Sequence, residues 1–144
     1  MTTIIAVLLI TSFLFLSGLH IYWACGGQWG SGAVIPTKDD NVKAMMPGVV
    51  PTLIVAIGLF GFGFVVFLNM VEFDFKISFW LYLVSKYGLW VIASIFILRA
   101  IGEFNYVGFF KKHKKTKFGQ NDTKYYSPFC LIIGILALIL ELKK

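Results

Sequence analysis

The chain has 144 residues, of which 58% are hydrophobic, 17% aromatic and only 14% charged. A soluble globular domain carries about 25% charged residues, so this composition excludes that class and predicts a protein embedded in a lipid bilayer. The formal net charge is +6. Most of the excess lies between residues 108 and 126, which indicates attraction to an anionic membrane surface and not to nucleic acid.

Four apolar stretches approach the roughly 20 residues that a membrane-spanning helix needs. They lie at about 3–24, 48–71, 87–107 and 127–142. We therefore predict an all-α membrane protein, a four-transmembrane-helix bundle that forms a single domain over residues 1–144. The last stretch is the weakest, because its uninterrupted core "PFCLIIGILALIL" is also short enough for a buried or re-entrant helix.

The first predicted span ends in "HIYWACGGQWG", directly after a run without any charge. His20 stands at the end of this helix, Trp23 follows one turn later, and Trp29 lies beyond a pair of glycines that permits a tight exit. One interpretation makes His20 and the two tryptophans part of a polar site. The simpler one makes His20 an interfacial histidine bonded to backbone or water.

Between the second and third spans, "EFDFKISFWLYLVSK" mixes charged and aromatic residues. This composition predicts a short amphipathic helix that lies in the membrane interface. The alternative starts the third span near Ile77 and immerses Lys86, which is costly at the middle of a bilayer. We therefore place the start of the third span near residue 87.

The third span contains the only arginine of the chain, in "FILRAIGEFNYVGFF". Arg99 and Glu103 are four residues apart, so on a continuous helix they share a face and can form an ion pair. An ionisable pair inside a membrane is a candidate functional site, although an arginine that reaches the headgroups with the help of its partner is the structural alternative.

The segment after the third span is basic, and the fourth span begins behind "NDTKYYSP". Its lysines are expected to contact anionic lipid headgroups, namely Lys111, Lys112, Lys114, Lys115 and Lys117. Asp122 or Ser127 is suited to cap the fourth helix, with Pro128 at its first position. Asp122 and Tyr126 are also candidates for the polar site.

Lysine counts predict the orientation. The two connections at 25–47 and 108–126 contain eight lysines, against four on the side of the termini. Because cytoplasmic loops are enriched in lysine and arginine, we expect both connections in the cytoplasm and both termini outside. The ligand-binding candidates then gather at the cytoplasmic end of the bundle: His20, Trp23, Trp29, Arg99, Glu103, Asp122 and Tyr126.

Three separated segments, "LHIYWACGGQWG", "RAIGEFNYVGFFKK" and "TKFGQNDTKYYSP", together with the closing apolar helix, resemble a bacterial integral membrane family known as domain of unknown function 3995. The resemblance covers nearly the whole chain and implies a small multi-pass protein of the bacterial cell membrane with no assigned activity. The matching segments contain His20, Trp23, Gly27, Trp29, Arg99, Glu103, Gly108, Asp122 and Pro128.

Three functions compete. The first is a binding or accessory module that holds an amphiphile, an anionic lipid headgroup or a partner membrane protein, either alone or as a homo-oligomer. The second is an enzyme acting on a lipid-like substrate, with His20 or Glu103 as acid or base and Arg99 on the anion. The third is a small oligomeric transporter. The two cysteines and two histidines have no metal-ligand spacing, so we expect neither a metal nor a cofactor.

Overall fold

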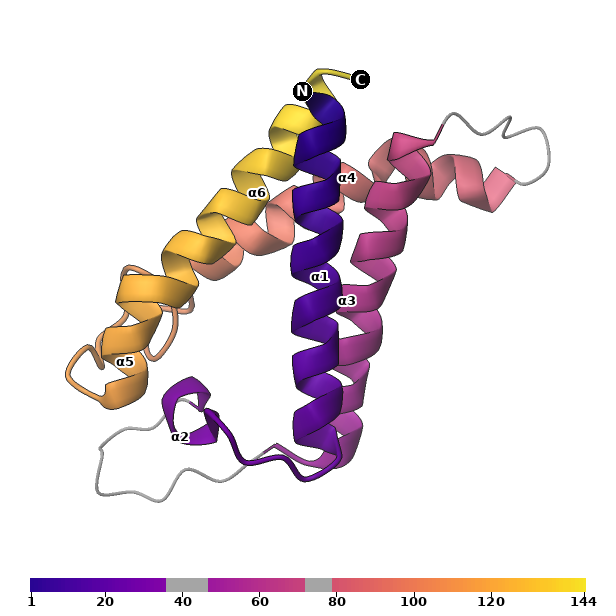
Figure 1. Cartoon of the computed structure of the whole chain (residues 1–144). Coiled ribbons are helices and arrows are strands. Elements are labelled where there is room, and N and C mark those ends of the chain that lie inside the picture. The colour runs from indigo at the N-terminus through magenta and orange to yellow at the C-terminus, as the bar shows by residue number, and fades with distance from the viewer. Residues whose placement is uncertain (36–46, 72–78) are drawn as a thin grey trace.

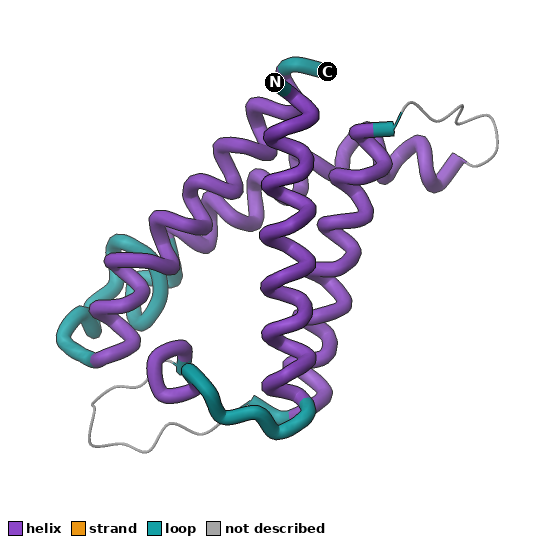
Figure 2. The backbone as a smooth tube through the Cα atoms, viewed as in Figure 1, coloured by secondary structure: helices purple, strands orange, loops and turns teal. Residues whose placement is uncertain are grey.

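The computed structural model, drawn in Figure 1, describes residues 1–35, 47–71 and 79–144, and every regular element in those ranges is a helix. The elements in chain order are α1 (Thr2–Ala24), α2 (Ser31–Val34), α3 (Val49–Met70), α4 (Phe79–Ile101), α5 (Lys117–Asn121), the π-helix η2 (Asp122–Tyr126) and α6 (Ser127–Leu142). Figure 2 shows that the loops between them lie at the two ends of the molecule. The predicted all-α architecture is confirmed.

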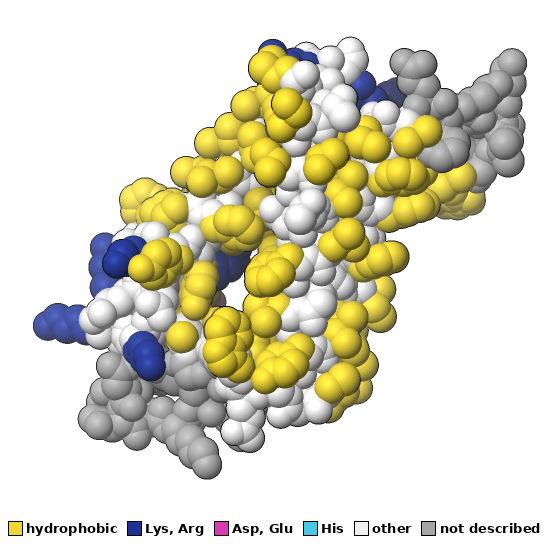
Figure 3. All heavy atoms as spheres, in the orientation of Figure 1, with side chains coloured by type: hydrophobic (Ala, Val, Ile, Leu, Met, Phe, Trp, Pro, Cys, Tyr) yellow, Lys and Arg dark blue, Asp and Glu magenta, His cyan; other side chains and the backbone are white. Residues whose placement is uncertain are grey.

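Among the described residues, four helices are long and apolar enough to cross a membrane: α1, α3, α4 and the rod formed by α5, η2 and α6 over Lys117–Leu142. Their outer faces expose large apolar side chains, such as Ile57 at 70% and Leu98 at 65%. Figure 3 shows such side chains along the visible length of the helices. Exposed apolar surface of this extent is stable when lipid covers it, so the chain is a multi-pass membrane protein.

The four long helices form two antiparallel pairs. Helix α1 packs mainly on α3, and α4 packs mainly on α6. The two pairs meet near the chain termini and diverge toward the opposite end, where α2 and α5 lie (Figure 1). This divergence creates the space in which the candidate site lies.

Three phenylalanines hold the pairs together at the level where they begin to diverge. The ring centroid of Phe13 on α1 lies 5.8 Å from that of Phe62 on α3 and 5.5 Å from that of Phe96 on α4. Close by, the buried Ser17 hydroxyl donates a 2.8 Å hydrogen bond to the Ala56 carbonyl and ties α1 to α3. The contacts of Phe96 with the other two rings are apolar packing between the pairs, whereas the Ser17 hydrogen bond stabilises the α1–α3 pair itself.

The third helix begins earlier than the sequence predicts. Of the expected interfacial helix, residues 72–78 lie outside the described residues, and residues 79–86 are the first two turns of α4. Lys86 is exposed, and its ammonium lies 5.6 Å from the ring of Tyr82 and 5.3 Å from the ring of Tyr87. The prediction of a separate helix up to residue 86 is wrong, because this lysine stays near one end of α4 beside two aromatic rings and need not be buried.

The fourth helix also begins earlier than expected. Its first turn is capped by Thr116, whose hydroxyl accepts a 3.0 Å hydrogen bond from the Gly119 N–H. Neither Asp122 nor Ser127 is the N-terminal cap of this rod, so that expectation is wrong. Pro128 has no N–H and its ring crowds the carbonyl four residues earlier, and the wider π-turn of η2 directly before it gives the rod room for this proline.

Candidate functional site

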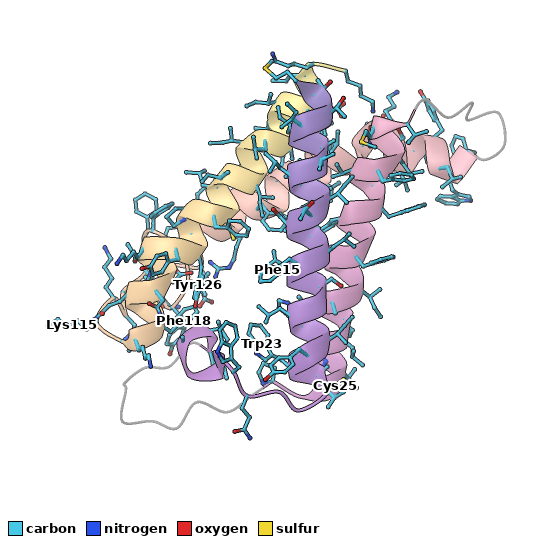
Figure 4. The ribbon with its side chains drawn as sticks, viewed as in Figure 1. Phe15, Trp23, Cys25, Lys115, Phe118 and Tyr126 are labelled. Carbon is cyan, nitrogen blue, oxygen red and sulfur yellow. The ribbon has the colours of Figure 1, made fainter. Side chains whose placement is uncertain are left out.

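A cleft of about 600 Å³ opens where the two helix pairs diverge. Figure 3 shows this face hollowed between α1 and α6, with basic side-chain atoms visible inside the hollow. In Figure 4, Trp23 on α1 faces the side of the hollow where Phe118 and Tyr126 lie, whereas Lys115 points away from it. The lining is mostly apolar and comes from every helical segment: Leu16, Leu19, His20, Trp23, Val34, Ile35, Pro47, Pro51, Thr52, Val55, Leu59, Phe96, Arg99, Phe118, Tyr126, Phe129 and Cys130.

Behind the wall of the cleft, the side chain of Asp122 is fully buried and accepts four hydrogen bonds. Oδ1 accepts from Arg99 Nη2 at 3.0 Å. Oδ2 accepts from the Gly108 N–H at 2.8 Å, from Lys111 Nζ at 2.9 Å and from the Ser127 hydroxyl at 3.0 Å. This carboxylate therefore joins α4, the connection before α5, and α6, and such full pairing is what makes a buried charge tolerable.

Lys111 is the second buried charge of this cluster. Its ammonium donates to the Gly108 carbonyl at 2.9 Å, to Asp122 Oδ2 at 2.9 Å and to the Thr123 hydroxyl at 2.6 Å. These three contacts use all three N–H donors of the ammonium. The expectation that Lys111 contacts lipid is wrong, because its side chain is completely enclosed by the protein.

Two glycines allow the connection before α5 to reach Asp122. Gly102 and Gly108 both have positive φ, at 92° and 91°, and a Cβ on either one would collide with the backbone of the other. This close crossing aims the Gly108 N–H at the carboxylate. Only glycine combines such backbone angles with such an approach.

Arg99 lies between this cluster and the cleft. Its side chain is 33% exposed, and within the described residues its hydrogen bonding is limited to the Nη2 contact with Asp122. Nη1 is buried and lacks a hydrogen-bond partner in the part of the chain that the structure describes. A guanidinium has five N–H donors, so the described residues use only a small part of the hydrogen-bonding capacity of Arg99.

His20 occupies the opposite wall. Its Nδ1 lies 2.8 Å from the Leu16 carbonyl, and because a carbonyl oxygen only accepts, Nδ1 carries the proton of this bond. Nε2 has no hydrogen bond to any described residue. The ring packs edge-on against Trp23 at 5.2 Å between centroids, and Trp23 Nε1 donates to the Trp29 carbonyl at 2.9 Å. The interpretation of His20 as a histidine bonded to backbone therefore explains Nδ1. It leaves Nε2 without a hydrogen-bond partner among the described residues.

The structure brings together only some of the residues that the sequence suggests. His20, Trp23, Arg99 and Tyr126 line the cleft, with Asp122 directly behind Arg99. Tyr126 also donates a 3.3 Å hydrogen bond to the carbonyl of Ala33 in α2. The Trp29 side chain is 74% exposed and does not line the cleft.

Glu103 is not the partner of Arg99. Helix α4 ends at Ile101, and the positive φ of Gly102 turns the chain before Glu103, so the spacing of four residues no longer places both side chains on one face. Glu103 is exposed and forms no ion pair with any described residue. The expected pair is therefore wrong, and the partner of Arg99 is Asp122, 23 residues further along the chain.

Sequence reasoning missed the cluster around Asp122. The sequence suggests Ser127 as a cap and Lys111 as a surface residue, yet both bind the same carboxylate. The sequence contained one signal, since Gly102 follows the last helical residue of α4 in the way that helix-ending glycines do. Of the described residues, no group of three His, Cys, Asp or Glu could hold a metal ion.

Four membrane-length helices and an apolar cleft backed by buried charges define a multi-pass helical membrane protein with a cleft between its two helix pairs. The chain belongs to the family described as "Protein of unknown function (DUF3995)", whose model matches residues 13–137. This match includes every residue of the Asp122 cluster and confirms the resemblance in the sequence. Comparisons with curated proteins and with solved structures each found no match.

Proposed function

We propose that this protein is a membrane-embedded binding module that holds the apolar chain of one amphiphilic molecule in the cleft. The observation that carries the proposal is the cleft itself, an apolar space of about 600 Å³ between membrane-length helices with polar groups confined to a few positions. Ligand sites have volumes of about 300–1,000 Å³ and the same mixture of apolar walls and few polar groups.

The position of the cleft indicates where such a ligand comes from. The space lies between helices whose outer faces suit lipid, so a molecule dissolved in the bilayer reaches it without crossing water. The volume suits one chain and is small for a lipid with two long chains. A site of this kind binds a lipid-like molecule for presentation or sensing, and we place it at the cytoplasmic end of the bundle on the lysine count.

The test is photolabelling with a single-chain amphiphile that carries a diazirine in its chain. We expect saturable labelling of peptides that contain cleft residues such as Leu19 and Val55. Val55→Trp fills the cleft and should abolish this labelling, because Val55 lines the space. Ile57→Trp is the matched control, since Ile57 is on the same helix, is 70% exposed and does not line the cleft.

Two results would contradict the proposal. One is labelling confined to the lipid-facing sides of the helices. The other is cleft labelling that is equal in the Val55→Trp and Ile57→Trp proteins. Val55 and Ile57 are both exposed residues of α3, so we expect both variants to fold. A difference in labelling between the two proteins is then due to the cleft.

A further inference from the structure

The two cations beside Asp122 have different hydrogen-bonding states. Lys111 uses all its donors on protein acceptors and has no access to the cleft. Arg99 makes one hydrogen bond, leaves the buried Nη1 without a partner among the described residues, and is one-third exposed at the cleft wall. Lys111 is therefore a structural cation, whereas Arg99 retains donors for a further acceptor.

The charges of the cluster do not cancel. Arg99 and Lys111 contribute two positive charges, and Asp122 contributes one negative charge. The other acidic residues that the structure describes are Glu103, which is exposed beyond α4, and Glu141, which pairs with Lys144 near the chain termini. An excess positive charge next to an apolar space inside a membrane is costly unless an anion accompanies it.

We infer that the ligand is an amphiphile with a single chain and an oxyanion head, a carboxylate or a phosphate, and that its head is bound by the guanidinium of Arg99. This inference rests on the proposed function of the cleft. Binding of the head at Nη1 requires the guanidinium to turn toward the cleft while Nη2 keeps its hydrogen bond to Asp122. Asp122 then acts as a positioning residue that holds the guanidinium at the wall, and the apolar lining takes the chain.

His20 contributes on the other wall. Since its Nδ1 proton is committed to the Leu16 carbonyl, a neutral His20 offers Nε2 only as an acceptor. An acceptor suits a head that still carries one proton, such as a phosphate monoester monoanion. A protonated His20 would instead donate to the head. In both states the ring is a secondary contact, and Arg99 provides the charge that selects an anion.

The experiment measures competition against the photoreactive probe by four unlabelled molecules with the same chain: myristate, myristyl phosphate, myristyl alcohol and myristyl trimethylammonium. The pH is set so that the carboxylate is ionised, and the micelles are neutral. The Val55→Trp protein supplies the background. We expect one or both anions to compete at least about ten-fold more strongly than the alcohol, as a hydrogen bond to a charged group predicts. The cation should compete least.

Variants then assign the preference to Arg99. Arg99→Gln should lose the preference for the anions while the alcohol still competes, and Arg99→Lys should retain part of it. Lys115→Gln is the control, because it removes the same charge from an exposed side chain that points away from the cleft (Figure 4). If Arg99→Gln does not fold, the competition series on the unmodified chain decides on its own.

The outcomes separate the two proposals. Equal competition by the anions and the alcohol, or an anion preference that survives Arg99→Gln in a folded protein, overturns the inference about the head and leaves the cleft as a site for an apolar chain. Absence of cleft labelling with the unmodified protein overturns the proposed function and this inference with it. A preference that only one anion shows supports the inference and identifies the head as carboxylate or phosphate.

Discussion

Asp122 accepts hydrogen bonds from three parts of the chain, so its substitution affects more than one contact. Arg99 approaches from α4, Gly108 and Lys111 from the connection before α5, and Ser127 from α6. A carboxylate at this position converts four separate donors into one cross-link. The residue therefore has a structural role that is independent of any ligand, and its ion pair with Arg99 links that role to the cleft.

Asp122→Asn should destabilise the protein by about 3–5 kcal/mol, because it leaves the enclosed ammonium of Lys111 without its counter-charge. The measurement is the free energy of unfolding in detergent. The double variant Asp122→Asn with Lys111→Met should recover part of this loss, since it removes both buried charges together. Lys112→Met serves as the control at an exposed neighbouring position. A double variant no more stable than Asp122→Asn alone would show that the ion pair with Lys111 is not the source of the loss.

Glu103→Gln should leave the unfolding midpoint and the anion preference of the cleft unchanged, because Glu103 is exposed and lies beyond the end of α4. This variant distinguishes the observed Arg99–Asp122 pair from the Arg99–Glu103 pair that the sequence spacing suggests. Loss of stability comparable to that of Asp122→Asn would contradict the exposed and unpaired position of Glu103 among the described residues.

The elements around the cluster depend on unusual local backbone. The connection before α5 crosses itself at Gly102 and Gly108, and the rod that follows contains a π-turn where Pro128 interrupts regular helix bonding. Both irregularities lie next to Asp122. The π-turn also contains Tyr126, which lines the cleft and donates the hydrogen bond to the Ala33 carbonyl. The local widening that accommodates the proline therefore also affects the position of this cleft residue.

Gly108→Ala should loosen the connection between α4 and α5. An alanine there requires a strained positive φ and collides with the backbone of residues 101 and 102, at a cost of about 1–3 kcal/mol. Limited trypsin digestion provides the measurement, because cleavage after the exposed lysines 112, 114 and 115 should become faster. Gly61→Ala on α3 is the control, since a Cβ there meets open space. Equal cleavage rates in the two variants would contradict a tightly fixed connection.

At the scale of the whole molecule, hydropathy was sufficient to predict the architecture. The four apolar stretches became four membrane-length helices because the bilayer requires every span to satisfy its own backbone hydrogen bonds. The ends of the helices were less predictable. Lys86 suggested an interface, yet two tyrosines next to it allow α4 to begin at Phe79.

The site was predictable in its location but not in its pairing. Helix direction alone places His20, Arg99 and Tyr126 at the same end of the bundle, and the cleft contains all three. The contact of Arg99 with Asp122 depends instead on where α4 stops and on how the following connection folds back. Such contacts between a loop and a helix have no periodicity, so spacing along the chain does not reveal them.

Orientation in the membrane is the last prediction. The structure places both termini at one end and the connections after α1 and α4 at the other (Figure 1). Eight lysines on the side of the connections, against four on the side of the termini, predict cytoplasmic connections and external termini. Alkaline phosphatase fused after Lys144 should therefore be active in a bacterial host, and a fluorescent reporter that matures only in the cytoplasm should be dark at the same position. The same two reporters inserted after Lys115 are the control and should give the opposite pattern. A fluorescent, phosphatase-silent fusion at Lys144 would show the opposite orientation, with the cleft near the outer leaflet. The ligand would then come from that leaflet, and the proposed contact of its head with Arg99 would be unchanged.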